Sequence, residues 1–260
     1  MSVTRVGSTG QRLKELPYDR RVAFLENYPT CLQPPGGWER PMDVAQKDAG
    51  RVGYKALAGP SLEEYVEIIA DMGAEVQIVC GEVQRGTPRF PSKLIPPHPH
   101  VAEDRLPDFL KLAHERGIIV LSYFSMNFNR PLKQIHPEWL MEFVFDGRPI
   151  IENEGWWCFN SPYRDWLPEY LTEFLDHLDL DGFYFDDTNY GSHEGRPFYP
   201  SCCCSHCAEL FGAETGLEIP RKVDFDAADF RTFVNWRYDK TREFVQHVFA
   251  RVHERHPDAI

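Results

Sequence analysis

The sequence predicts an α/β fold with one parallel sheet, and three observations support this. A unit made of an amphipathic helix, a glycine and a β-branched or aromatic run occurs three times along the chain. The apolar runs are nearly continuous, which is typical of strands buried on both faces. Strands that alternate with helices are joined by right-handed crossovers, so they lie parallel.

The first strand is predicted from the run RRVAFLENY at residues 20–28, which is the weakest of the four. The first complete unit follows, where Ser61 and Glu64 have the spacing of a helix capping box. One helical face is formed by Leu62, Tyr65, Val66 and Ile69. Gly73 then precedes the strand AEVQIVC.

The second and third units repeat this order. In the second, Gly117 precedes IIVLSYF, and in the third, Gly182 precedes FYFDD. The helix of the second unit has its apolar face at Leu106, Phe109, Leu110 and Ala113. The helix of the third has it at Leu167, Tyr170, Leu171, Phe174 and Leu178.

A long fourth helix is predicted to end near HERHPDAI, which leaves Ile260 where a fifth strand would begin. Its apolar positions are Phe233, Tyr238, Phe244, Val245, Val248 and Val252. A (β/α)8 TIM barrel needs eight β/α units and the chain supplies about four, so we expect the N-terminal half of such a barrel; an open sheet is the alternative. We expect an extension at residues 1–20, the barrel part at 21–260 and a cysteine-rich loop at 192–220.

The composition is that of an ordinary globular protein, with 42% hydrophobic residues and a formal net charge of −12 among 260 residues. This charge disfavours nucleic acid as a partner. No stretch approaches the roughly 20 apolar residues that span a bilayer, and the N-terminus has no apolar core of a secretory signal. We therefore expect a cytoplasmic protein that binds neither nucleic acid nor membrane, and leave a homo-oligomer open.

Asp186 and Asp187 end the strand of the third unit, where active sites of parallel α/β folds form. Side chains alternate along a strand, so Asp186 shares a face with Tyr184, and we favour Asp186 as the functional acid. A carboxylate there could act as a nucleophile, stabilise a cationic transition state or hold a metal. Capping the next helix is the structural alternative.

Cys202, Cys204 and Cys207 form a C-x-C-x2-C pattern, three thiols on one tight loop that a tetrahedral Zn²⁺ can use. Reduced thiols and a disulfide are the alternatives, and an odd cysteine count without a signal peptide argues against the disulfide. Cys80, inside an apolar run, is predicted to be a core residue. Tyr123, Trp156 and Trp157 are candidate substrate contacts or packing residues.

Four stretches together resemble a known family. These are DGFYFDD at residues 181–187, HPEW at 136–139, CFNSPYRDWL at 158–167 and the C-x-C-x2-C pattern at 202–207. Over residues 20–260 the chain resembles the uncharacterised "hypothetical glycosyl hydrolase" barrels related to family 29 α-L-fucosidases and family 42 β-galactosidases. Those proteins are much longer, which favours the half-barrel prediction.

The resemblance implies a carbohydrate substrate and a retaining glycosidase with Asp186 as the nucleophile. By the same resemblance, His98 and His100 bind substrate, and Cys158 is the fourth ligand of a structural zinc. His193 and His206 are alternative ligands. No organic cofactor is implied.

The chain departs from the family 42 pattern at the general acid/base, because Asn189 stands where that family has Glu. Family 29 instead implies an acid from a later strand. Within the chain, Asp187, Glu194 and Glu82 are candidates for the second acid. A catalytically inactive carbohydrate-binding or scaffold barrel is therefore the alternative function.

Overall fold

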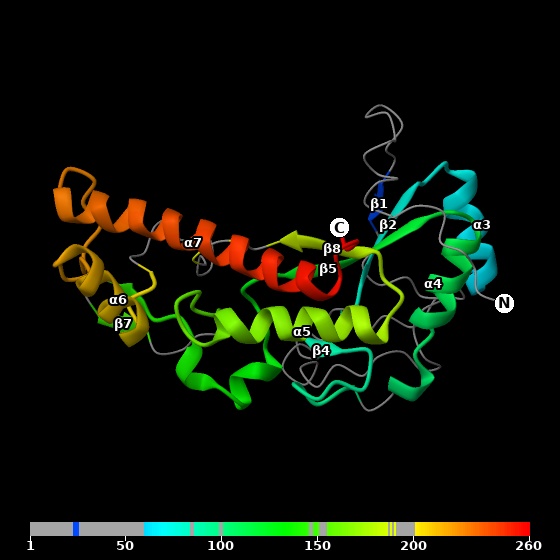
Figure 1. Cartoon of the computed structure of the whole chain (residues 1–260), viewed down its shortest axis with the longest axis horizontal. Helices are drawn as coiled ribbons and strands as arrows, with labels where there is room; N and C mark the ends of the chain where they lie inside the picture. Colours follow the sequence, from blue (N-terminus) through cyan, green and yellow to red (C-terminus); the bar gives the residue numbers. More distant parts are fainter. Residues whose placement is uncertain are drawn as a thin grey trace, which may run out of the picture. The chain divides into compact units, whose positions relative to one another are not determined.

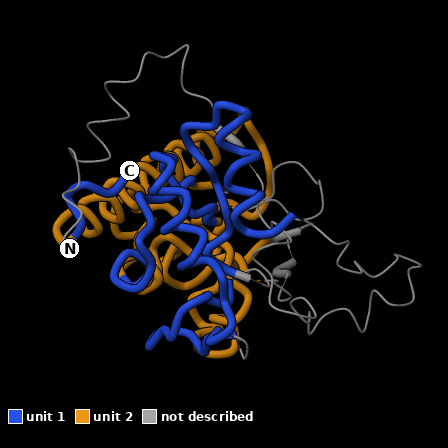
Figure 2. Tube along the Cα trace, turned by 90° about the vertical axis from the view of Figure 1, so that its right-hand side faces the viewer, with its two compact units in different colours: residues 1–124, 173–184, 256–260 blue, residues 125–172, 185–255 orange. Residues whose placement is uncertain are grey.

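The computed structural model describes residues 23–25, 60–83, 86–98, 101–145, 148–150, 155–186, 188, 190 and 201–260. The chain divides into two compact units (Figure 2). Unit 1 comprises residues 1–124, 173–184 and 256–260, and unit 2 comprises residues 125–172 and 185–255.

A four-stranded sheet has the order β1 (Ala23–Leu25), β2 (Val76–Cys80), β5 (Ile119–Ser125) and β8 (Gly182–Asp186) (Figure 1). β1 pairs with β2, and β2 with β5, in parallel register. Spatial order follows chain order, as expected for successive β/α units. The predicted α/β fold with a parallel sheet is therefore confirmed, and the half-barrel stays a prediction.

The last residue of the chain pairs with the outer edge of β8. The Ile260 N–H donates to the carbonyl of Asp181, and the Phe183 N–H donates to the carbonyl of Ile260, both over 3.0 Å. This is the pattern of a parallel pair in which Gly182 faces Ile260. A side chain at Gly182 would collide with the Ile260 backbone, so glycine is needed for this approach. Ile260 is thus hydrogen-bonded to β8, and a fifth strand beginning there stays a prediction.

The helices α3 (Leu62–Asp71) and α4 (Leu106–Glu115) of unit 1 carry the predicted apolar faces, and every apolar position predicted for them is buried. The capping box of α3 is complete: the Glu64 N–H donates to Ser61 Oγ over 3.2 Å, and the Ser61 N–H donates to Glu64 Oε2 over 2.8 Å. Gly73 and Gly117 follow these helices with φ of 77° and 73°, a left-handed conformation that glycine adopts without strain.

The two faces of the sheet have different partners within unit 1. On one face, Tyr123 and Ile260 pack against the buried residues Val76, Ile78, Ile119 and Leu121. On the other, Phe124 and Phe183 make edge-to-face contacts with Phe174 of α5 (Tyr163–His177). The five apolar positions predicted for the third helix are all buried: Leu167, Tyr170, Leu171, Phe174 and Leu178.

Unit 2 contains α6 (Ser205–Thr215) and the long helix α7 (Ala228–Arg255). Of the apolar positions named for this helix, Phe233, Phe244, Val248 and Val252 are buried, whereas Tyr238 is 72% exposed. Tyr238 lies on the polar side of a helix that buries only one stripe.

Several short elements were not predicted. Their periodicity is too brief to read from sequence, since each spans only two to four residues. They are the hairpin β3 (Glu82–Val83) with β4 (Thr87–Pro88), the hairpin β6 (Phe143–Phe145) with β7 (Arg148–Ile150), and the 3-10 turns η4 (Val101–Glu103), η5 (Pro131–Gln134) and η6 (Pro137–Trp139).

Candidate functional site

Asp186 is the last residue of β8, at the carboxyl end of the parallel sheet. It is exposed, and its backbone carbonyl accepts a hydrogen bond from the Met126 N–H over 2.9 Å. Phe185, on the opposite face of the strand, packs edge-to-face on Phe249 at 5.5 Å. The strand end is therefore anchored through its backbone and through Phe185, while Asp186 itself is exposed. Asp187 lies outside the described residues.

Tyr123 is half-buried and stacks on Tyr184, with ring centroids 6.2 Å apart. Tyr184 is exposed, and by strand alternation it shares its face of β8 with Asp186. Sequence reasoning did not assign Tyr184 a role, although its alternation with Asp186 was visible. The predicted substrate contact of Tyr123 stays a prediction.

His98 is only 3% exposed, and its backbone N–H donates to the carbonyl of Pro88 over 3.4 Å. A histidine in a proline-rich loop is usually exposed to solvent, but His98 is buried. His100 lies outside the described residues. The same loop contains Arg89, whose buried ion pair with Asp104 was not foreseen, because the two residues are 15 positions apart.

The two neighbouring tryptophans have different environments. Trp156 is half-buried and packs edge-to-face on Phe128 at 5.3 Å. Trp157 has 0% exposure; its indole N–H donates to the carbonyl of Asn129 over 3.0 Å, and its ring stacks on Tyr163. Trp157 therefore packs in the interior of unit 2, and of the two tryptophans Trp156 is the one that is partly exposed to a ligand.

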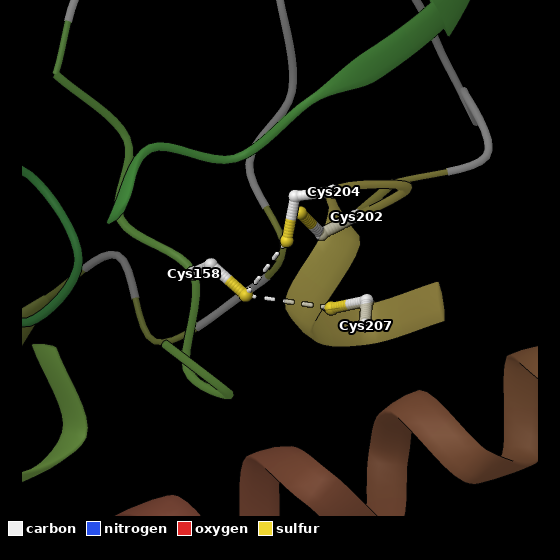
Figure 3. A group of neighbouring side chains, drawn as sticks. All are labelled: Cys158, Cys202, Cys204 and Cys207. Atoms are coloured by element: carbon white, nitrogen blue, oxygen red, sulfur yellow. Dashed lines mark hydrogen bonds between the residues drawn. The ribbon is translucent and has the colours of Figure 1, made fainter. Parts of the chain in front are cut away.

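The predicted cysteine cluster is the most complete site in the described part of the chain. The sulfur atoms of Cys158, Cys202, Cys204 and Cys207 all lie within 4.8 Å of one another and converge on a common centre (Figure 3). Cys158 Sγ is 3.4 Å from Cys207 Sγ and 3.5 Å from Cys204 Sγ. All four residues are at most 2% exposed.

Two separate segments bring these sulfurs together. Cys158 precedes α5, whereas Cys202 and Cys204 precede α6 and Cys207 lies in its first turn. Burial of this loop is supported by Ser201, whose Oγ donates to the carbonyl of Tyr190 over 2.7 Å.

Burial and hydrogen bonds within the cluster shift the pKa values of three of its thiols. Hydrogen bonds from the other three thiols hold the pKa of Cys204 far below its ordinary value, while burial raises the pKa of Cys202. The pKa of Cys207 is raised as well, chiefly by its hydrogen bond with Cys158. Without a cation, the arrangement thus favours one thiolate surrounded by thiols, because several buried thiolates would repel one another.

The geometry fits a tetrahedral metal ion. Zn–S bonds of about 2.3 Å give sulfur–sulfur separations of about 3.8 Å in a tetrahedron. The observed spacing of the four sulfurs is compatible with this value. The group that could hold a metal consists of the four cysteines, and His206, although described, is not part of it. His193 lies outside the described residues.

Backbone and side-chain N–H groups donate hydrogen bonds to the cluster sulfurs. The Glu142 N–H donates to Cys202 Sγ over 3.3 Å and the Asn160 N–H donates to Cys158 Sγ over 3.4 Å. The side-chain amide of Asn160 donates to Cys207 Sγ over 3.3 Å. Such bonds stabilise negative charge on sulfur and orient the ligands of a metal.

The candidates for a second catalytic acid are not distinguished by this geometry. Glu82 lies on β3 and is buried, and Asp187 and Glu194 lie outside the described residues, as does Asn189.

Cys80, predicted to be a core residue, is buried at the end of β2. Among the helices that the structure describes, none is long and apolar enough to cross a membrane.

Residues 61–187 match the model of a protein family described as hypothetical glycosyl hydrolase 6. The predicted resemblance to an uncharacterised glycoside hydrolase-like family is thereby confirmed over this segment, which includes the β8 carboxylates. A comparison with curated proteins found no match.

Among solved structures, the α-L-fucosidase isoenzyme 2 from Paenibacillus thiaminolyticus is similar at 21% identity with a TM-score of 0.56. The alignment covers 75% of this chain and 27% of the fucosidase, so this chain spans about a quarter of that protein. A β-galactosidase from Rahnella sp. R3 aligns at 17% identity with a TM-score of 0.49, over 76% of this chain and 32% of the enzyme. The fucosidase likeness concerns the fold.

Proposed function

We propose that this chain, whose residues 61–187 match a glycoside hydrolase-like family, is the N-terminal part of a (β/α)8 glycoside hydrolase that cleaves O-glycosidic bonds of carbohydrates. One observation carries the proposal. An exposed carboxylate, Asp186, ends a strand of the parallel sheet at its carboxyl edge, inside the segment that matches the family. Sites of parallel α/β folds form at this edge.

In the proposed reaction, Asp186 is the nucleophile of a retaining mechanism. Its carboxylate attacks the anomeric carbon and forms a glycosyl-enzyme intermediate while a second carboxyl group protonates the leaving oxygen. Water then releases the sugar, activated by the same second group acting as a base. The second group is proposed to come from a later strand; within this chain, Asp187, Glu194 and Glu82 stay the candidates.

The cysteine cluster is proposed to hold a structural Zn²⁺. Four thiolates fill a tetrahedral coordination shell and leave no position for a reactive water, so the ion would stabilise structure and take no part in hydrolysis. Within unit 2 it would tie the segment before α5 to the segment before α6.

Substrate contacts are proposed for Tyr123, Trp156, His98 and His100, and Tyr184 is added because it shares a strand face with Asp186. Aromatic rings at such positions bind the apolar faces of sugars. No contact is proposed for Trp157, because its indole N–H donates to the carbonyl of Asn129 and its ring stacks on Tyr163.

The test is hydrolysis of nitrophenyl glycosides (α-L-fucoside, β-D-galactoside, α- and β-D-glucoside) by the protein expressed from its complete reading frame. We expect Asp186→Asn to lower kcat by several orders of magnitude, because an amide cannot act as the nucleophile. Asp239→Asn, which changes an exposed acid paired with Arg242 on α7, is the matched control and is expected to keep wild-type activity.

Wild-type turnover that persists in Asp186→Asn would rule out this nucleophile. Binding of a sugar without turnover would instead favour the alternative function, an inactive carbohydrate-binding barrel, which the Asn189 replacement in the sequence allows.

A further inference from the structure

Asn160 lies between the two segments that supply the cysteine ligands. It follows Cys158 by two residues, in the turn that leads into α5, and its side chain extends to Cys207 in the first turn of α6. Asn160 is thus hydrogen-bonded to two sulfurs that come from different parts of unit 2.

The two hydrogen bonds have separate origins. The Asn160 N–H reaches Cys158 Sγ through the backbone of the turn, which the Ser161 N–H closes by donating to the carbonyl of Cys158 over 3.1 Å. Any residue at position 160 other than proline would keep this bond. The bond of 3.3 Å from Nδ2 to Cys207 Sγ depends on the amide itself.

A side-chain amide N–H is a suitable hydrogen-bond donor to a thiolate, the ionised form of cysteine. Nδ2–H is a donor without positive charge, so it stabilises charge on Cys207 and does not compete with a bound cation. Cys207 has 0% exposure, so water does not solvate its sulfur, and stabilisation of the ionised form must come from nearby donors or from a metal.

We infer that Asn160 is a positioning residue of the metal centre: it holds the sulfurs of Cys158 and Cys207 through two N–H···S hydrogen bonds, and its amide sets how tightly a divalent cation is retained. The inference rests on the proposed metal centre. Its experiment is chosen so that failure of the centre and failure of the role of Asn160 give different results.

The decisive variant is Asn160→Asp, which keeps the size of the side chain but replaces the amide donor with a carboxylate facing Cys207. Affinity for Zn²⁺ and Co²⁺ is measured by competition with a chelator, and the Co²⁺ protein is examined by absorption spectroscopy. We expect affinity to fall by about 10- to 100-fold, the usual effect of losing such an outer partner of a ligand. The charge-transfer bands from thiolate to cobalt should move to lower energy, because the Cys207 sulfur loses a stabilising donor.

Ser161→Ala is the matched control in the same turn, since Ser161 Oγ donates to the carbonyl of Cys158 and to no sulfur. It is expected to lower stability while leaving the metal affinity and the cobalt spectrum unchanged. Should Asn160→Asp fail to fold, Asn160→Ser removes the amide without adding charge, and a smaller loss of affinity in the same direction is expected.

Wild-type affinity and an unshifted spectrum in Asn160→Asp or Asn160→Ser would overturn the role of Asn160 and leave the metal centre standing. A wild-type protein that retains no Zn²⁺ and develops no thiolate-to-cobalt bands would overturn both. Activity on glycosides does not enter either result, so the hydrolase proposal is tested separately.

Discussion

Arg89 and Asp104 form a buried, bidentate ion pair next to the carboxyl end of β2. Arg89 Nε and Nη2 each donate to one oxygen of Asp104 over 2.7 Å, and the two side chains are 1% and 2% exposed. Arg89 Nη1 also donates to the carbonyl of Cys80, and Asp104 accepts the Leu106 N–H at the start of α4. One contact therefore connects a strand end, the loop that follows it and the next helix.

We expect Asp104→Ala to lower the free energy of unfolding by about 3–5 kcal/mol, because removal of one partner leaves a buried charge uncompensated. Denaturant unfolding followed by circular dichroism measures this loss. The matched control is Glu67→Ala, which breaks the exposed pair between Glu67 and Arg116. That change should cost no more than about 1 kcal/mol.

Equal losses of unfolding free energy in Asp104→Ala and Glu67→Ala would contradict the expectation that burial makes the Arg89–Asp104 pair matter more for stability.

His114 should make the stability of unit 1 depend on pH. A hydrogen bond of 2.9 Å between Nε2 and Asp181 raises the pKa of His114, against the opposing effect of burial, and Asp179 raises it further. A raised pKa in the folded state means that protonated His114 stabilises the fold. This stabilisation is complete below the unfolded pKa of about 6.5 and is lost as the pH rises through the folded pKa.

The difference in unfolding free energy between wild type and His114→Gln should therefore be larger at pH 5.5 than at pH 8.5. Denaturant titrations of both proteins at the two pH values provide this comparison, and other titrating groups cancel in the difference. A difference that grows with pH would mean that protonation of His114 destabilises the folded state, contrary to the effect expected from Asp181 and Asp179.

Gly81 follows β2 at a point with no room for a side chain. A Cβ there would lie 2.6 Å from Ser122 Oγ and 2.8 Å from a ring carbon of Phe174. Gly81→Ala should cost roughly 1–3 kcal/mol, the usual range for overpacking a core. Gly212, inside α6, has its nearest neighbour at 3.7 Å, so Gly212→Ala should stabilise the protein by about 0.5–1 kcal/mol.

Thermal unfolding of the two alanine variants beside the wild type distinguishes them, since their midpoints should move in opposite directions. A Gly81→Ala protein as stable as the wild type would show that Phe174 and Ser122 can move aside without cost.

The regular helices could be predicted because their signals are local. The Ser61–Glu64 capping box and the apolar face of α3 depend on residues three or four positions apart, and the structure has both as expected. The apolar face of α4 is equally local. Tyr238 is exposed although it belongs to the apolar positions of its helix, because helical spacing identifies an apolar stripe but does not say how wide a stripe the neighbouring elements cover.

The cysteine cluster could be predicted only in part from the sequence. The C-x-C-x2-C spacing identified three sulfurs, and a family resemblance suggested Cys158 as the fourth, but their convergence within 4.8 Å required the folded chain. Asn160 had no signal of its own, because an asparagine near a cysteine is commonplace until Cys207 is brought from 47 positions away.

Local patterns in the sequence were enough to predict the helix–strand alternation, the helix limits set by capping residues and glycines, and the placement of Asp186 at a strand end. The pairing of polar groups became visible only in the folded chain: Arg89 with Asp104, His114 with Asp181, and Asn160 with Cys207. The physical reason is that helix and strand patterns repeat over a few residues. Burial of a charge, a thiol or an amide instead requires partners that loop closure brings from distant positions.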